Sequence, residues 1–242
     1  MEDWEELLAY LAKRAIKGND AAALRDAIRR GADVNRMVPC RNKLTRARGH
    51  FPLLFLAVSE GLVGMCEILL AEGADANIPA TTNGDSALHR AASQGFTAYV
   101  RLLLDAGADP NFQAIDRTTP LHTASYNGHV PAAKLLIAAG ANLQASNQRG
   151  FTPLRLALLN GRREVALTLL RAGAAITALR RAEITPENGA LHDYMIDIID
   201  TGGWNARVER HRRPLMSILS NLALPHDALV VVLSFWSPPG GR

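Results

Sequence analysis

The sequence is poor in cysteine, which excludes several kinds of site. Its 242 residues include two cysteines, Cys40 and Cys66, which lie 26 residues apart without a Cys-x-x-Cys spacing. Such a pair provides neither a disulfide framework nor the clustered thiolates of a zinc site. We therefore expect a chain that works in a reducing, intracellular location, cytoplasmic or nuclear.

Long hydrophobic runs and a secretory leader are also missing. No apolar stretch approaches the roughly 18 residues that a membrane-spanning helix requires. Residues 2–6 are mostly acidic, whereas the start of a secretory signal is basic. With a hydrophobic content of 48%, the chain can still bury a continuous core. We therefore expect a soluble protein with no membrane association.

The chain does contain a repeat with a period of about 33 residues, and this repeat sets the register of the other features. Four leucines lie 34, 33 and 33 residues apart: Leu54, Leu88, Leu121 and Leu154. A glycine stands seven positions after each of them: Gly61, Gly95, Gly128 and Gly161. A Gly-Ala motif ends each of these four units, and a further copy at Gly31 marks one more unit before them. The five motifs are Gly31-Ala32-Asp33-Val34-Asn35, Gly73-Ala74-Asp75, Gly107-Ala108-Asp109, Gly140-Ala141-Asn142 and Gly173-Ala174-Ala175. The chain therefore holds five units.

Each unit is predicted to form a helix, a turn, a second helix and a loop. Ala and Leu recur at three- and four-residue spacing between glycines, which is typical of paired helices. In the fourth unit, Thr119 and Pro120 provide a capping residue and a proline at the first helical position. Gly128 and Gly140 end the two helices, Gly128 where a positive backbone dihedral is needed. One such pair cannot bury its own faces, so the units are expected to stack.

On these residues the chain resembles the ankyrin-repeat family. The motif Thr119-Pro120-Leu121-His122, the pair Gly128-His129 and the Gly-Ala-Asp-x-Asn closures carry the resemblance, which covers roughly residues 10–176. It implies an all-α solenoid of five units over residues 1–176, and a role in binding another protein. The second unit departs from the pattern, because Phe55 replaces the usual histidine and Pro52-Leu53 replaces Thr-Pro. The first unit is degenerate, and its apolar helical stripe suits an N-terminal cap: Trp4, Leu7, Leu8, Leu11 and Ala15.

A basic insertion of about nine residues lies over 36–48, since 42 residues separate the closures at Gly31 and Gly73. Its cations are Arg36, Arg41, Lys43, Arg46 and Arg48. We predict an enlarged loop, which is either a solvated surface insertion or a contact for a ligand. The formal net charge of +4 permits anionic partners, but residues 36–48 hold no aromatic side chain on which a base could stack. This argues against nucleic acid as the partner.

Residues 177–242 lack the period and are predicted to form a helical C-terminal region. One interpretation is a cap over the open end of the stack. The alternative is a substrate-recruiting adaptor of a ubiquitin ligase, because Leu224-Pro225 followed by an apolar helix resembles the beginning of an F-box and a segment of a SOCS box. A further alternative is weak binding of nucleic acid or another polyanion through 36–48 and the basic segment 207–213.

No motif for catalysis or for a cofactor stands out. The resemblance implies that His89 and His122 tie neighbouring loops together. Gly84-Asp85-Ser86 is similar to the serine motif of GDS-type esterases, but Ser86 lies in register with the helix-capping Thr119. Neither a phosphate-cradling loop nor a GxSxG turn is present, and the other histidines share no metal-ligand spacing. We expect no catalytic residue, no cofactor and no metal, and therefore no enzyme.

The partner is expected to contact the concave face that the resemblance implies, formed by the first helices and the loop tips. Positions two, five and six after each repeat leucine, together with the loops, give the candidate residues: Arg90, Ser93, Gln94, Arg117, Thr123, Tyr126, Asn127, Gln148, Arg149 and Asn160. Arg90 and Tyr126 lead this set, because Arg and Tyr dominate binding hot spots. Leu156 and Leu159 fall at the same positions in the last unit, where they either face the partner or pack beneath the C-terminal region. The sequence indicates no oligomeric state.

Overall fold

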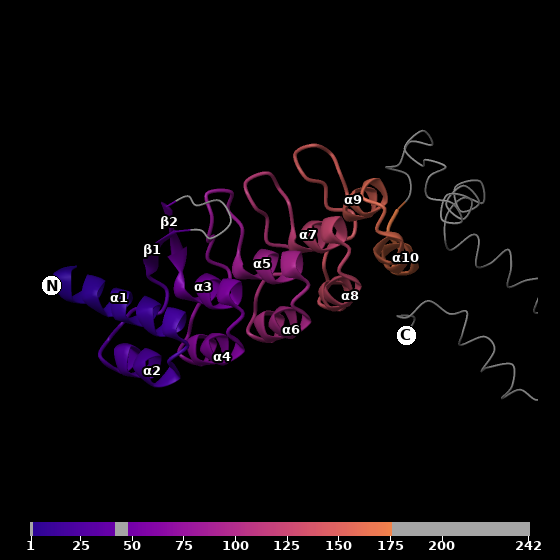
Figure 1. Cartoon of the computed structure of the whole chain (residues 1–242). Coiled ribbons are helices and arrows are strands. Elements are labelled where there is room, and N and C mark those ends of the chain that lie inside the picture. The colour runs from indigo at the N-terminus through magenta and orange to yellow at the C-terminus, as the bar shows by residue number, and fades with distance from the viewer. Residues whose placement is uncertain (1, 42–47, 176–242) are drawn as a thin grey trace, which may run out of the picture.

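The computed structural model describes residues 2–41 and 48–175, in which ten α-helices form five consecutive pairs. The helices are α1 (Glu2–Gly18), α2 (Ala21–Arg29), α3 (Leu53–Glu60), α4 (Val63–Ala71), α5 (Ala87–Gln94), α6 (Thr97–Asp105), α7 (Pro120–Asn127), α8 (Val130–Ala138), α9 (Pro153–Leu159) and α10 (Arg163–Arg171). The odd-numbered helices form one row and the even-numbered helices a second row beside it (Figure 1). Successive pairs pack on one another, so the predicted solenoid is confirmed.

The helix ends follow the sequence pattern. Thr119 and His122 form a capping box at the start of α7, in which the Thr119 hydroxyl lies 2.8 Å from His122 Nδ1. Gly128 ends α7 in the left-handed region with a φ of 88°, as predicted. Pro52 provides no side-chain cap for α3, which agrees with the departure of the second unit from the pattern.

The repeat leucines form the core between the two rows. Leu88, Leu121 and Leu154 are all at most 1% exposed. Burying one such side chain stabilises the fold by roughly 1.5–3 kcal/mol. Ala91 and Ala124 are fully buried in α5 and α7, and their small size allows these helices to approach closely. The same positions recur in every regular unit, so one packing interface is repeated along the stack.

The first helix pair only partly matches the predicted apolar stripe. Leu8 and Ala15 of α1 are buried, as expected for a cap of the stack. Leu7 belongs to the same predicted stripe but is 44% exposed. This exposure leaves an apolar side chain on the surface of the N-terminal pair.

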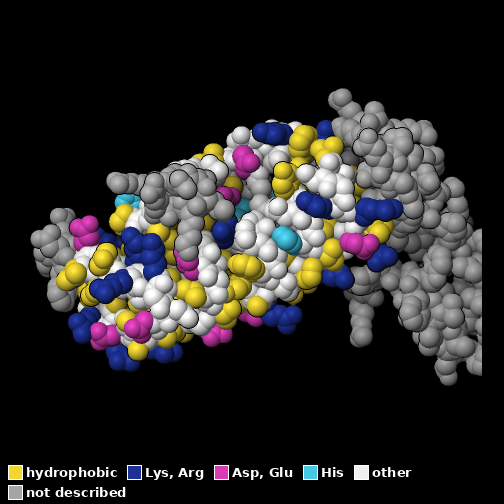
Figure 2. Space-filling view, in the orientation of Figure 1, with side chains coloured by type: hydrophobic (Ala, Val, Ile, Leu, Met, Phe, Trp, Pro, Cys, Tyr) yellow, Lys and Arg dark blue, Asp and Glu magenta, His cyan; other side chains and the backbone are white. Residues whose placement is uncertain are grey.

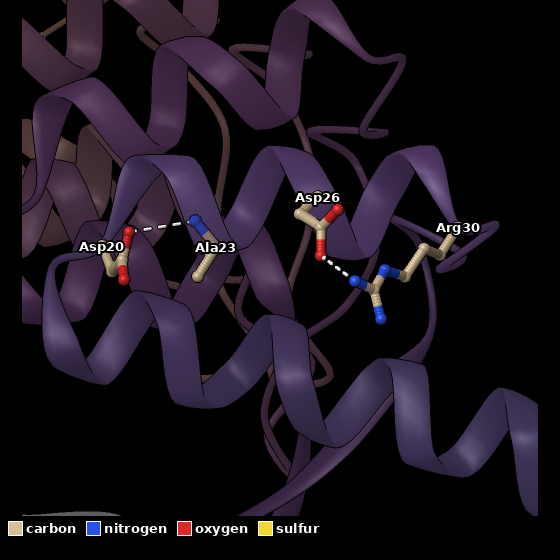
Figure 3. A network of polar contacts seen from close by, with 4 residues as sticks. All are labelled: Asp20, Ala23, Asp26 and Arg30. Carbon is tan, nitrogen blue, oxygen red and sulfur yellow. Dashed lines mark hydrogen bonds and ion pairs between the residues drawn. The ribbon is translucent and has the colours of Figure 1, made fainter.

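Helix α2 carries its own capping residue and a surface ion pair (Figure 3). Asp20 Oδ1 accepts a hydrogen bond of 2.9 Å from the backbone N–H of Ala23, which satisfies one of the free donors at the helix start. Asp26 and Arg30 lie one turn apart and form an ion pair of 2.8 Å. Both side chains are about half exposed, so the pair contributes only about 0.3–0.5 kcal/mol.

The insertion differs from the expected loop, because it forms two antiparallel strands, β1 (Met37–Arg41) and β2 (Arg48–Pro52). Val38 pairs with Phe51, and both side chains are buried, while Met37, Pro39 and His50 beside them are exposed. Phe51 also stacks on Phe55 of α3, with 5.6 Å between the ring centroids. The alternation of buried and exposed residues gives this segment the two-residue period of a strand.

The loops that precede α5, α7 and α9 project to one side of the stack, and the hairpin lies on this same side ahead of α3 (Figure 1). We call the three loops fingers, and define them by residues 80–85, 114–118 and 147–151. No helix within 2–41 and 48–175 has both the length and the apolar character to cross a bilayer. The predicted C-terminal region 177–242, with Leu224-Pro225 and the basic segment 207–213, lies outside the described residues.

Candidate functional site

Two buried histidines connect the second and third fingers to the unit before each. His89 Nε2 lies 2.9 Å from the carbonyl oxygen of Thr118, and His122 Nε2 lies 2.9 Å from that of Phe151. A carbonyl oxygen can only accept, so each Nε2 carries the hydrogen and each Nδ1 is free to accept from the capping residue of its own helix. Burial lowers the pKa of both rings below the ordinary 6.5, which favours this neutral form. The role implied by the family resemblance is confirmed.

Ser86 is a helix cap with a structural partner. Its hydroxyl lies 3.0 Å from His89 Nδ1, a contact that in other settings activates a nucleophile. Here Ser86 is 1% exposed, and the other ring nitrogen of His89 is held by a carbonyl. Thr119 and His122 repeat the arrangement one unit later. The pair therefore belongs to the repeat geometry.

The Cys66 thiol and the acidic and histidine side chains of the described residues likewise form no reactive site. Burial raises the pKa of the Cys66 thiol to about 12, so it stays protonated at neutral pH and offers no thiolate to a metal or a substrate. Among the residues that the structure describes, no three His, Cys, Asp or Glu side chains come together as a metal site would require.

Asparagines form a second ladder of hydrogen bonds between units, which was not among the predictions from the sequence. The Asn77 side chain donates to the carbonyl of Gly107 at 3.2 Å and accepts from the N–H of Asp109 at 2.8 Å. Asn35 and Asn111 make the same two bonds to the following closure, at 2.7–3.4 Å. These asparagines are the last residue of each Gly-Ala-Asp-x-Asn closure, so the sequence already contained the pattern that marks the ladder.

The fingers are tied to one another at their tips. Ile115 N–H donates to the Asn83 carbonyl at 2.8 Å, and Gln148 N–H donates to the Asp116 carbonyl at 2.8 Å. The Gln148 side chain adds a bond of 2.8 Å to the Ile115 carbonyl. These bonds hold the three fingers as one surface, and they occupy one of the predicted partner-binding residues, Gln148.

Three further predicted residues contribute to the internal structure. The Asn127 side chain donates to the Thr123 carbonyl at 2.9 Å, and that of Asn160 donates to the Leu156 carbonyl at 2.8 Å. The Ser93 carbonyl accepts from His129 Nε2 at 3.0 Å. These side chains and backbone groups brace the helix ends, so their positions in the register do not by themselves mark a binding contact.

The other predicted residues lie at the surface. Gln94, Arg117 and Arg149 are exposed, and Tyr126 is 52% exposed although its carbonyl accepts from Arg162 Nε at 3.0 Å. Thr123 is half-buried, with its hydroxyl bonded to the Pro120 carbonyl at 2.8 Å.

Arg90 is half-buried in α5 and is incompletely satisfied. Its Nε is buried and makes no hydrogen bond with any residue of 2–41 or 48–175. A buried donor without an acceptor lowers the stability of the fold. Because this nitrogen is itself covered, it is not a contact point for a partner, and Arg90 stays a predicted binding residue on its register position alone.

The fingers add an apolar contact that the register count did not include. Ile115 at the tip of the second finger is 68% exposed, the highest value among the exposed large hydrophobic side chains of the described chain. Arg117 follows it in the same finger with a φ of 62°, a conformation that costs a non-glycine residue free energy. The second finger therefore presents an apolar and a cationic side chain together.

The repeats match a known protein family. A family model for ankyrin repeats (3 copies) matches residues 11–114 and 106–179. Together these segments cover more than half of the chain and coincide with the stacked helix pairs. The search of curated proteins returned no match.

Proposed function

Because the chain belongs to the ankyrin-repeat family, whose members generally serve as protein–protein interaction modules, we propose that it binds another protein on the surface formed by its fingers and the row α5, α7 and α9. The binding is non-enzymatic, and the protein acts as a scaffold or adaptor for its partner. The residues proposed to carry it are four exposed members of the predicted set, Gln94, Arg117, Tyr126 and Arg149, together with the half-buried Arg90 and Thr123.

The observation that carries this proposal is the exposure of Tyr126 next to an apolar neighbour. Tyr126 and Leu159 occupy the same register position in α7 and α9, which pack directly on each other, and they are 52% and 50% exposed. Two large side chains on successive repeats form the kind of anchor that dominates measured interfaces. Ile115 adds an exposed apolar side chain on the finger of the same unit.

Charge supports a partner segment that carries carboxylates. Arg90, Arg117 and Arg149 lie on consecutive units of this surface. Asp116, which is exposed on the second finger, carries the opposite charge. One of its carboxylate oxygens accepts a hydrogen bond of 2.9 Å from the Thr118 N–H. Arginine binds carboxylates through paired hydrogen bonds, so an acidic and partly apolar segment fits this surface.

The proposal is tested by affinity capture from cell extract with mass spectrometry, using the full chain and a variant with Arg90→Ala and Tyr126→Ala. We expect specific proteins to be captured by the full chain and lost by the variant. A matched control with Arg101→Ala and Lys134→Ala removes exposed side chains from α6 and α8 in the other row. Equal capture by all three proteins would refute the surface. Repeating the capture without residues 177–242 separates recruitment through the C-terminal region from binding by the repeats.

A further inference from the structure

The hairpin insertion builds a groove against the first helix. The groove has a volume of about 560 Å³ and lies between α1 and the strands β1 and β2. Its lining comprises Glu6, Leu7, Ala9, Tyr10, Lys13, Arg36, Met37, Val38, Pro39 and His50. Binding sites commonly span about 300–1,000 Å³, so the groove is large enough to receive side chains of a ligand. It stands at the N-terminal end of the stack and shares no residue with the finger surface.

The walls of the groove are apolar and exposed. Leu7 is 44%, Tyr10 is 55% and Met37 is 38% exposed, while Val38 and Ala9 beneath them are nearly fully buried. These three are among the seven large hydrophobic side chains that are exposed in the described residues. Scattered exposed apolar residues need no explanation, but their convergence on one hollow marks a contact site.

Among the lining residues that the structure describes, two cations and one carboxylate stand at the rim: Lys13, Arg36 and Glu6. His50 adds an imidazole from β2. In Figure 2, hydrophobic and basic side chains lie side by side at this end of the molecule (left). An apolar ligand with carboxylates therefore matches both the walls and the excess charge of the rim.

Recognition in this groove depends on side chains because β1 is blocked as a template for strand addition. Pro39 has no N–H to donate to an added strand. Its carbonyl already accepts from Lys13 Nζ, a bond that ties β1 to α1. A peptide that added to this edge would find neither group free at Pro39, whereas side chains can enter between Tyr10 and Met37.

We propose that this groove is a second protein-binding site, which takes a peptide segment of a partner with an aliphatic or aromatic anchor next to one or more carboxylates. The anchor inserts between Leu7, Tyr10 and Met37, and the carboxylate faces Lys13. The site is independent of the finger surface, so one molecule holds two segments at once, one at each part of the stack.

The test uses a random peptide-display library as the probe, selected on the full chain after depletion on a Tyr10→Ala, Met37→Ala variant. Both side chains are exposed, so the variant is expected to stay folded. The selected peptides should contain a large apolar residue beside Asp or Glu. Their affinity should fall about tenfold for the variant and should fall also for Lys13→Gln, which keeps a donor for Pro39 but loses the charge.

Two controls separate this site from the finger surface. Tyr126→Ala should leave the affinity of the selected peptides unchanged, and so should Val63→Ala, which removes an exposed apolar side chain from α4. Failure to select any peptide, a basic consensus, or equal affinity for the Tyr10→Ala, Met37→Ala variant would overturn the proposal. If the selected peptides instead lost affinity for the Tyr126→Ala variant, their binding site would be the finger surface. A single-stranded oligonucleotide that bound in place of peptide would identify a polyanion site and would also overturn it.

Discussion

Arg117 occupies a position that glycine occupies in the two neighbouring fingers. Gly84 and Gly150 have φ values of 79° and 71° at the corresponding place, and Arg117 follows the same backbone path at 62°. A side chain in this conformation costs roughly 1–3 kcal/mol, and such strain is concentrated at binding and catalytic sites. The second finger therefore carries backbone strain at a position where the other two fingers have glycine.

We predict that Arg117→Gly raises the free energy of unfolding by about 1 kcal/mol, because relief of the strain exceeds the entropic cost of glycine. Chemical denaturation measures this change. The same variant should weaken binding of the partner. Arg149→Gly is the matched control, since the φ of Arg149 is not positive, and it should lower stability by about 0.5–1 kcal/mol. Equal changes in the two variants would contradict the assignment of strain.

Ser125 and Ser86 form a second matched pair. Both are at most 1% exposed, but the Ser125 hydroxyl bonds to no residue of the described chain, whereas that of Ser86 contacts His89 at 3.0 Å. We predict that Ser125→Ala raises the free energy of unfolding by about 1 kcal/mol and that Ser86→Ala lowers it by a similar amount. The midpoint of urea unfolding distinguishes the two. Destabilisation by Ser125→Ala would mean that its hydroxyl has a partner.

At the scale of elements, the histidine bridges make the contact between helices and fingers dependent on pH. Burial holds the pKa of His89 and His122 below 6.5 in the folded chain, whereas the unfolded chain has the ordinary value. The unfolded state thus binds more protons below pH 6.5. Stability is fully present above that pH and falls as the pH drops from 6.5 through the lowered folded values.

We therefore predict that the free energy of unfolding decreases between pH 7 and pH 5, and that this decrease becomes smaller in a His89→Gln, His122→Gln variant. Thermal unfolding across this pH range measures the slope. The variant is expected to be less stable at pH 7, because the bridges to Thr118 and Phe151 are altered. An identical slope in both proteins would show that other groups cause the acid sensitivity.

The elements themselves could largely be predicted from the sequence. Leucine and glycine at fixed spacing predicted the helix pairs, because periodic burial depends on local residues alone. The hairpin was predicted as a loop. The sequence shows no apolar–polar alternation there, since Met37-Val38-Pro39-Cys40 is an uninterrupted apolar run. Burial on one face appears only when the strands pair and Phe51 reaches Phe55. Strand pairing depends on contacts with residues outside the insertion. The loop was predicted from the length and the basic residues of the insertion, which do not report on such contacts.

The sequence predicts which repeat positions lie near the surface, but it does not predict which hydrogen bonds those side chains make. Counting from the leucines gave Arg90 and Tyr126 as predicted binding residues, and the loops gave Arg117. The same count included Asn127 and Asn160, whose side chains instead bond to carbonyls one turn earlier in their own helices. The count also omitted the exposed residues of the groove, because that hollow exists only where the insertion meets α1. The position of a side chain within a repeat can be read from the sequence, because the repeat has a fixed period. Its hydrogen-bond partners depend on how the chain packs.

At the scale of the whole molecule, the two proposed surfaces lie in different parts of a stack whose units contact only their neighbours. In such a stack, stability is approximately a sum of unit and interface terms, so one end can unfold while the remainder stays folded. The groove depends on α1 and therefore on the first pair, whereas the finger surface depends on the third to fifth pairs. The two binding functions should respond separately to destabilisation.

Leu24 of α2 and Leu103 of α6 test this separation, since both are 0% exposed. Replacement of either by alanine removes roughly 2–5 kcal/mol of packing. Leu24→Ala should increase hydrogen exchange in residues 2–29 and abolish binding of groove-selected peptides, while exchange in residues 87–138 and partner capture by the fingers are kept. Leu103→Ala should increase exchange on both sides of α6 and weaken the finger surface. If Leu24→Ala instead increased exchange throughout the stack, the chain would unfold as one cooperative unit and the two surfaces could not be regulated independently.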